Sequence, residues 1–254
     1  MFLSFCSSIA FAEVFQYFDE DGTLIITDNP FGTKKKKPHT NINIQKESIP
    51  NEIIAKELKS SLIEDVIYDY YPVNAKNYHD AVNSTSLNGP YDEKENKTYA
   101  GQTTWNLGLS YKYDYSHQIA GQQVNIFTNI YDVEFRSYIS VLLPALSENS
   151  ALSGQDMEQW NSFLYGLLEH EHDHVRIVRE PSFRDEAIQK ISSLKEFTFK
   201  YDPSSNLDEL IRNTVESETG KIGCDMSKKI KKLNDEYDRL TDHGLKPEMK
   251  GVFF

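Results

Sequence analysis

Apolar and polar residues alternate at the start of the chain, and this alternation predicts a β-hairpin. Residues 14–28 alternate on both sides of Asp21-Gly22, a dipeptide that favours the tight turn of a hairpin. We therefore expect a small β-hairpin unit over residues 13–33. The lysine run at residues 34–37 and the polar residues after it are typical of a solvated tether, so residues 34–50 are interpreted as a linker.

The rest of the chain, residues 51–254, has the pattern of one larger domain in which strands precede helices. Apolar residues at helical spacing predict a helix over residues 51–64. Alternating β-branched and aromatic residues predict three strands, over residues 66–73, 103–115 and 124–143. Helical spacing dominates after about residue 155. This order predicts an α+β fold with a β-rich first half followed by helices.

One predicted helix, over residues 156–180, carries candidate catalytic chemistry. Within it, residues 170–174 read His-Glu-His-Asp-His and satisfy the pattern His-Glu-x-x-His. His170 and His174 lie one helical turn apart, so both imidazoles point at the same place, and Glu171 lies beside them. Two nitrogen ligands, an open position for water and a carboxylate base are what a catalytic zinc ion requires.

The motif leaves the third zinc ligand open. His172 projects about 200° around the helix from His170, so we interpret it as a residue that does not bind the metal. His243 follows the apolar stripe of a predicted C-terminal helix and precedes Gly244, a typical helix stop. The candidates for the third ligand are Glu180, Glu216, Glu218 and His243.

Net charge and hydropathy disfavour two classes of protein, namely nucleic-acid-binding and membrane-spanning proteins. The chain of 254 residues has 39 acidic against 27 basic residues and a net charge of −12, which disfavours binding to the phosphate backbone of nucleic acids. No window approaches the ~20 apolar residues that a transmembrane helix needs. The first twelve residues are apolar and end in Ala10-Phe11-Ala12, so residues 1–12 are interpreted as a secretory signal peptide. We expect a periplasmic or secreted protein.

Motifs from about residue 69 to residue 251 occur in the order found in a known family. They are Tyr71-Pro72-Val73, Gly89-Pro90, Gly101 with Thr103 and Trp105, Leu143-Pro144, Trp160, the His170 to His174 motif, Cys224 and Tyr237-Asp238-x-x-Thr241-x-His243-Gly244. This stretch resembles the DUF922 family, a bacterial domain of unknown function whose members are predicted to be secreted zinc-dependent proteases with a zincin-like fold. The resemblance implies a site role for the last motif, with His243 as the simplest third ligand.

The chain departs from that family at two positions, and a second family resembles its N-terminus. Members commonly pair the cysteine at Cys224 with one near Val124, where this chain has none, and they often have a small residue at the position of Asp173. The N-terminal stretch resembles the DUF4124 hairpin family, which implies export to the cell envelope. The matching residues are Tyr17, Asp19, Asp21, Gly22, Thr27, Asp28 and Pro30.

Together these patterns predict an exported zinc metallopeptidase that acts on a peptide or protein substrate, envelope-associated substrates included. Zinc is expected on His170, His174 and His243, and Glu171 is expected to activate the zinc-bound water as general base. Tyr237 or Tyr165 could donate to the oxyanion. The alternative is a non-catalytic envelope binding or scaffold protein with a structural or vestigial zinc site. A hydrolase of envelope amide bonds, such as peptidoglycan crosslinks, shares the same chemistry.

Overall fold

The computed structural model describes residues 15–18, 24–27, 61–93 and 95–254. The predicted signal peptide, the predicted linker and most of the helix predicted over residues 51–64 lie outside the described residues, so these remain predictions. The chain divides into two compact units, which are described in turn. The first comprises residues 1–35, 106–138 and 179–233, and the second comprises residues 36–105, 139–178 and 234–254.

The described strands and helices confirm a mixed α+β architecture. One sheet has the strand order β1 (Phe15–Phe18), β2 (Leu24–Thr27), β6 (Gln102–Ala120), β7 (Gln123–Leu146) and β3 (Val66–Val73), and β8 (Glu196–Lys200) pairs with β7. Strands β4 (Tyr91–Asp92) and β5 (Lys97–Thr98) form a separate small sheet. Strands β6 (Gln102–Ala120) and β7 (Gln123–Leu146) run through both units, as does helix α5 (Leu207–Thr241). The strands predicted over residues 103–115 and 124–143 lie within β6 and β7, which extend further at both ends.

In the first unit, the N-terminal hairpin belongs to the sheet, which corrects the expectation of a separate small unit. Strands β1 (Phe15–Phe18) and β2 (Leu24–Thr27) pair antiparallel, and β2 continues onto β6, with Leu24 opposite Leu109. Ile26 is fully buried and packs directly against Gly223 of α5. A Cβ atom at position 223 would clash with the Ile26 side chain. An isolated two-stranded hairpin is marginally stable in water, so pairing with β6 is what gives this one a buried face.

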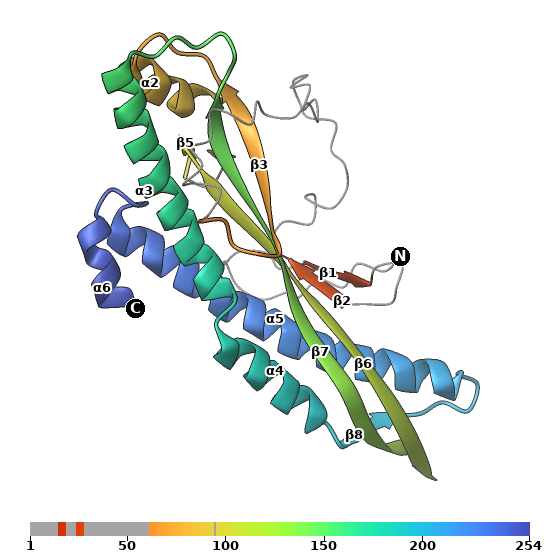
Figure 1. The fold of residues 1–254 in the computed structure, drawn as a ribbon. Coiled ribbons are helices and arrows are strands. Elements are labelled where there is room, and N and C mark those ends of the chain that lie inside the picture. The colour runs from red at the N-terminus through yellow and green to blue at the C-terminus, as the bar shows by residue number, and fades with distance from the viewer. Residues whose placement is uncertain (1–14, 19–23, 28–60, 94) are drawn as a thin grey trace. The chain divides into compact units, whose positions relative to one another are not determined.

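The remainder of the first unit packs one end of the sheet against α5. Helix α4 (Pro181–Ser192) is followed by β8 (Glu196–Lys200), which pairs antiparallel with β7. Figure 1 shows β8 near the start of α5. Val124 and Ile126 form a buried cluster there with Ile211 of α5. Period-2 alternation along β7 therefore supplies the apolar face that α5 covers.

The second unit holds the predicted active-site helix. Strand β3 (Val66–Val73) coincides with its prediction and runs parallel to the end of β7, from Val66 opposite Ile139 to Val73 opposite Leu146. Helices α2 (Tyr78–Asn88) and α3 (Gly154–Val178) lie side by side (Figure 1). Their shared core consists of Tyr71, Val73, Ala75, Ala81, Leu146 and Trp160.

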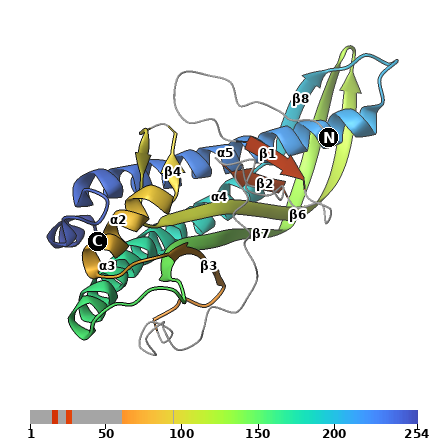
Figure 2. The same ribbon diagram turned by 90° about the horizontal axis from the view of Figure 1, so that it is seen from above.

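Short elements complete the second unit. Strands β4 (Tyr91–Asp92) and β5 (Lys97–Thr98) form a hairpin that lies next to α2 (Figure 2). The 3₁₀ helix η1 (Pro247–Met249) and helix α6 (Lys250–Phe253) follow α5. No helix within the described ranges combines the length and hydrophobicity needed to span a membrane.

Local capping explains where α3 begins. Ser153 Oγ accepts a hydrogen bond from the Asp156 backbone N–H and also donates to the Asp156 carboxylate. The first contact satisfies one of the backbone N–H groups that the first helical turn leaves free, and the second joins the two side chains. The helix then runs to Val178, two residues short of the predicted end, and Pro181 takes the first position of α4, where its missing N–H is not needed.

Candidate metal centre

Helix α3 buries five consecutive ionisable residues. Each of the residues 170–174 is at most 8% exposed, although His, Glu and Asp are seldom fully buried without partners. A polar side chain inside a protein costs free energy unless it is hydrogen-bonded or charge-paired. We therefore expect these five residues to have hydrogen-bonding or charged partners in the second unit.

Two of the five converge with an aspartate from α5. His170 Nε2 lies 3.2 Å from His174 Nε2, and Asp238 Oδ1 lies 3.0 Å from His174 Nε2 and 3.2 Å from His170 Nε2. A tetrahedral zinc ion with bonds of about 2.0–2.1 Å holds its ligand atoms about 3.3 Å apart. Two imidazole nitrogens and one carboxylate oxygen at this spacing fit a single zinc ion, and they form a group that could hold a metal.

The third member of this group differs from the sequence expectation. His243 was the expected third ligand, but its Nδ1 lies 3.7 Å from Asp238 Oδ1 and it does not join the group. Glu216 and Glu218 belong to the first unit, where they pair with Arg212 and Lys221. Glu180 is the exposed residue that precedes α4. Asp238 takes the position because it lies on the face of α5 that meets α3, whereas His243 lies beyond the helix end.

The pKa values of this group follow from its close contacts. Burial raises the pKa of Asp238, but hydrogen bonds and positive charge from His170 and His174 outweigh it and hold that pKa well below its usual range. Burial lowers the pKa of His174, but the hydrogen bond and negative charge of Asp238 outweigh it and raise the pKa to about 9. Asp238 is therefore an anion at neutral pH, as a metal-binding carboxylate must be.

The Glu171 carboxylate contacts residues at the N-terminal end of β6. Thr103 Oγ1 donates to Glu171 Oε2 at 2.7 Å. A Cβ atom at Gly101 would lie only 2.6 Å from Glu171 Oε1, so glycine lets the chain pass close to the carboxylate. Burial raises the pKa of Glu171, and the nearby His174 and His170 and the Thr103 hydroxyl partly offset that rise. A carboxylate with a raised pKa next to two imidazoles suits proton transfer.

His172 lies apart from the ligand group, as its position on the helix predicts. Its Nε2 is 2.9 Å from the Tyr68 hydroxyl of β3, which also accepts a hydrogen bond from the Ile63 backbone N–H. The Tyr68 hydroxyl either donates to His172 Nε2 or accepts from it, according to which ring nitrogen carries the hydrogen. This hydrogen bond to the buried His172 joins α3 to β3.

Asp173 joins α3 to the C-terminal part of the chain. It accepts hydrogen bonds from the Tyr237 hydroxyl and from Arg176, and Lys250 Nζ of α6 lies 2.6 Å from its Oδ2. Burial raises the pKa of Asp173, but Lys250 and Tyr237 lower it further than burial raises it. The aspartate that departs from the family pattern is thus a buried anion with three partners, directly before His174.

The turn after α5 explains the motif that ends at Gly244. Thr241 Oγ1 donates to the Tyr237 carbonyl and accepts from the Gly244 backbone N–H. Asp242, His243 and Gly244 all have φ between 51° and 84°, in the left-handed region. A Cβ atom on Gly244 would lie 3.0 Å from His170 Cγ. The helix therefore ends at Thr241, where Asp242 begins the left-handed turn, and Gly244 packs against the ring of a candidate ligand.

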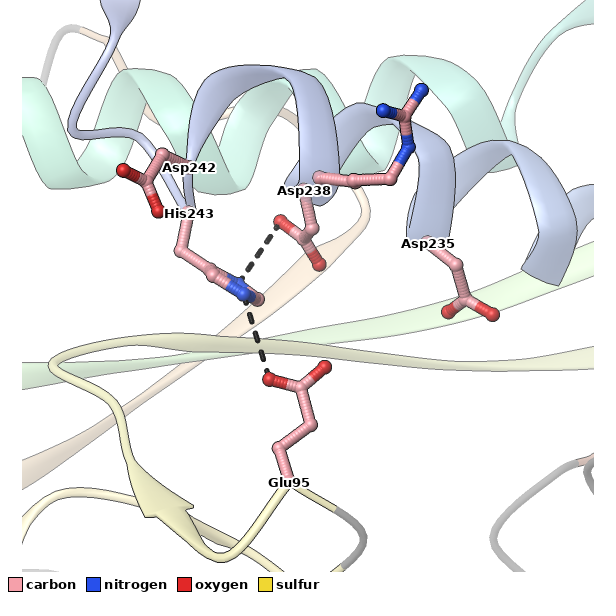
Figure 3. A pocket seen from close by; sticks show the side chains of 6 residues that line it. Glu95, Asp235, Asp238, Asp242 and His243 are labelled. Carbon is pink, nitrogen blue, oxygen red and sulfur yellow. Dashed lines mark ion pairs between the residues drawn. The ribbon is translucent and has the colours of Figure 1, made fainter.

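Asp238 also lines a cavity of about 310 Å³ (Figure 3). His243 lies in its wall, with its ring 4.5 Å from that of Tyr99 and its Nε2 3.5 Å from Glu95 Oε2. The full lining is Glu95, Asp235, Asp238, Arg239, Asp242 and His243. The cavity gives the candidate metal ligand an open side.

The two tyrosines considered as oxyanion donors have different surroundings. The Tyr237 hydroxyl donates to Asp173, and its ring stacks on His170 with centroids 5.2 Å apart. Tyr165 is 52% exposed on α3. Tyr237 instead supports the two residues that it contacts.

Comparison with known proteins gives a family and no activity. The family model described as "Bacterial protein of unknown function (DUF922)" matches residues 68–244. These residues include the buried stretch of α3, Asp238 and the turn to Gly244. No curated protein matches the chain, and no solved structure matches it.

Proposed function

The chain belongs to the DUF922 family of bacterial proteins of unknown function, and we propose that it is a zinc-dependent peptidase with a zincin-like fold. The observation that carries the proposal is the triangle of His170 Nε2, His174 Nε2 and Asp238 Oδ1, with edges of 3.0–3.2 Å. Its donor types and spacing suit zinc. Glu171, on the same helix, adds the carboxylate that hydrolysis requires.

The number of ligands supports a catalytic over a structural site. Structural zinc sites usually close with four protein ligands, whereas catalytic sites have three and keep one open position. Within the described residues, three ligand atoms come together, and one of them belongs to a residue that lines a cavity. A scaffold protein with a closed zinc site would need a fourth ligand, and His243, the ligand that the sequence suggested, lies apart from the group.

In this proposal, a zinc ion bound at the triangle would polarise the scissile carbonyl and lower the pKa of a water molecule. Glu171 accepts a proton from the attacking water and then passes it to the leaving amine. Thr103 holds the Glu171 carboxylate through the 2.7 Å hydrogen bond. Gly101 lets the chain pass close to that carboxylate. The substrate is a peptide or protein amide, and the predicted export signal suggests that it is met outside the cytoplasm.

Metal analysis combined with Glu171→Gln tests the proposal. We expect the purified chain to contain stoichiometric zinc and to cleave a fluorescent casein substrate. Glu171→Gln should keep zinc and lose activity by about 100-fold or more, because the amide cannot accept a proton. Glu158→Gln, at an exposed position of the same helix, is the matched control and should leave both unchanged. Absence of bound zinc, or full activity in Glu171→Gln, would overturn the proposal.

A further inference from the structure

A side chain of α5 lies behind one of the candidate ligands. Asn234 Oδ1 is 2.7 Å from His174 Nδ1, on the far side of the ring from the atom that faces Asp238. An amide oxygen only accepts hydrogen bonds. The hydrogen in this contact must therefore be on His174 Nδ1.

The position of that hydrogen decides which nitrogen of His174 can bind a metal. A neutral imidazole carries one hydrogen, so a hydrogen on Nδ1 leaves the lone pair on Nε2. Nε2 is the atom that lies 3.0 Å from Asp238 Oδ1 and 3.2 Å from His170 Nε2. In the opposite tautomer, Nε2–H would donate to Asp238 and occupy the direction in which the ion must lie.

The other histidine of the group has no such support in the described part of the chain. His170 Nδ1 is buried and lacks a hydrogen-bond partner there. Its ring is held by packing, between Tyr237 and Gly244. Of the two imidazoles, the one from His174 is thus fixed by a polar contact as well as by packing.

We propose that Asn234 is a positioning residue of the metal centre, which holds His174 in the tautomer that offers Nε2 to the ion. The inference rests on the proposed zinc site. Hydrogen-bond partners of metal-binding histidines fix tautomer and ring orientation, and their loss typically costs about 10–100-fold in metal affinity. Asn234 should therefore affect zinc binding without touching the ion.

Zinc affinity, measured on the full chain by competition with a chromophoric chelator, tests this role. Asn234→Leu removes the acceptor at similar size and should weaken zinc binding by about 10–100-fold. Asn234→Asp restores an acceptor and should return the affinity to within a few-fold of wild type or above it. Asn213→Leu, at an exposed position of α5, is the matched control and should bind zinc as wild type does. The Co²⁺ absorption spectrum should change in Asn234→Leu alone.

The outcomes separate this role from packing and from the proposed function. Thermal unfolding of the metal-free variants shows whether each one folds, and Asn234→Ala gives the same comparison if the leucine variant does not. If wild type binds zinc and Asn234→Leu binds it equally well, only the inference is overturned. If Asn234→Asp binds as weakly as Asn234→Leu, the effect is one of packing and the inference is again overturned. If wild type itself binds no zinc, the proposed function fails and the inference fails with it.

Discussion

Two regions of the second unit build the candidate metal centre in different ways. The stretch at residues 170–174 is regular helix, buried throughout, and its two ligands are fixed by the spacing of one helical turn. The stretch at residues 234–244 is partly exposed: Asp238 keeps 27% of its side-chain surface and His243 keeps 25%. It leaves the helix through three residues with positive φ. The first region depends on local geometry and the second on tertiary packing.

This difference predicts which substitutions should affect metal binding and which should affect folding. In α3, the two candidate ligands flank residues that attach the helix to its neighbours, namely His172 to β3 and Asp173 to α5 and α6. At the end of α5, the ligand, its neighbours and the turn lie on one continuous segment. Changes in this segment should therefore affect metal binding more directly.

The largest expected effect concerns the ligand that tertiary packing supplies. Asp238→Ala should lower zinc affinity by orders of magnitude, because it leaves two imidazoles to hold the ion. His243→Ala should retain stoichiometric zinc, because its nearest ring nitrogen is 3.7 Å from Asp238 and outside the ligand group. Zinc analysis after gel filtration measures both. Loss of zinc in His243→Ala, with retention in Asp238→Ala, would restore the ligand role that the sequence suggested for His243.

The next effect tests the buried anion of α3. Asp173→Ala should lower the free energy of unfolding by about 3–5 kcal/mol, because it removes one partner from a buried charge network and leaves Lys250 and Tyr237 unpaired. Arg176→Ala should cost less than about 1 kcal/mol, since the arginine side chain is 53% exposed. Urea unfolding of the chelator-treated proteins gives both values. Equal losses in the two variants would contradict a special role for the Lys250 and Tyr237 contacts.

Two glycines provide a smaller and more selective contrast. Gly244→Ala should cost about 1–3 kcal/mol, because φ is 84° and the new methyl group would press on His170. It should also weaken zinc binding. Gly166→Ala in α3 meets open space and should stabilise the helix by up to about 1 kcal/mol. Thermal unfolding with and without zinc separates the two effects, and a stabilised Gly244→Ala would show that the turn tolerates a side chain.

The smallest effect is expected at His172. His172→Phe keeps an aromatic ring in the buried position but removes the hydrogen bond between His172 and the Tyr68 hydroxyl, which should cost about 1 kcal/mol. Zinc affinity should stay within a few-fold of wild type. Chelator competition and urea unfolding measure the two quantities. A stoichiometric loss of zinc would mean that His172 belongs to the centre after all.

Local sequence patterns predicted much of this second unit. Strand β3 coincides with the predicted residues 66–73, and α3 begins and ends within two residues of its prediction. The convergence of His170 and His174 was also predicted, because one helical turn places both on the same face. Gly244 was expected as a helix stop, but α5 ends at Thr241, and Asp242 is the first residue after it with positive φ.

Long-range packing explains what the sequence did not reveal. Asp238 is one of 39 acidic residues, and although it lies in the motif that ends at Gly244, no local spacing rule selects it as a ligand. Its position four residues after Asn234 and three before Thr241 was the available signal, since residues at steps of three and four share a helix face. The pairing of β2 with β6 joins residues more than eighty positions apart, and no local pattern encodes such a partner.

The Lys250 contact has a practical consequence for producing this domain. The family match ends at residue 244, yet the amine that neutralises Asp173 comes from residue 250. A recombinant fragment cut at the limit of the match would therefore include every candidate ligand and lack a counter-charge beside one of them. Residues 68–244 alone are a poor choice of boundary, and a fragment meant for metal titration or crystallisation should extend at least through Phe254, whose ring packs against Tyr237.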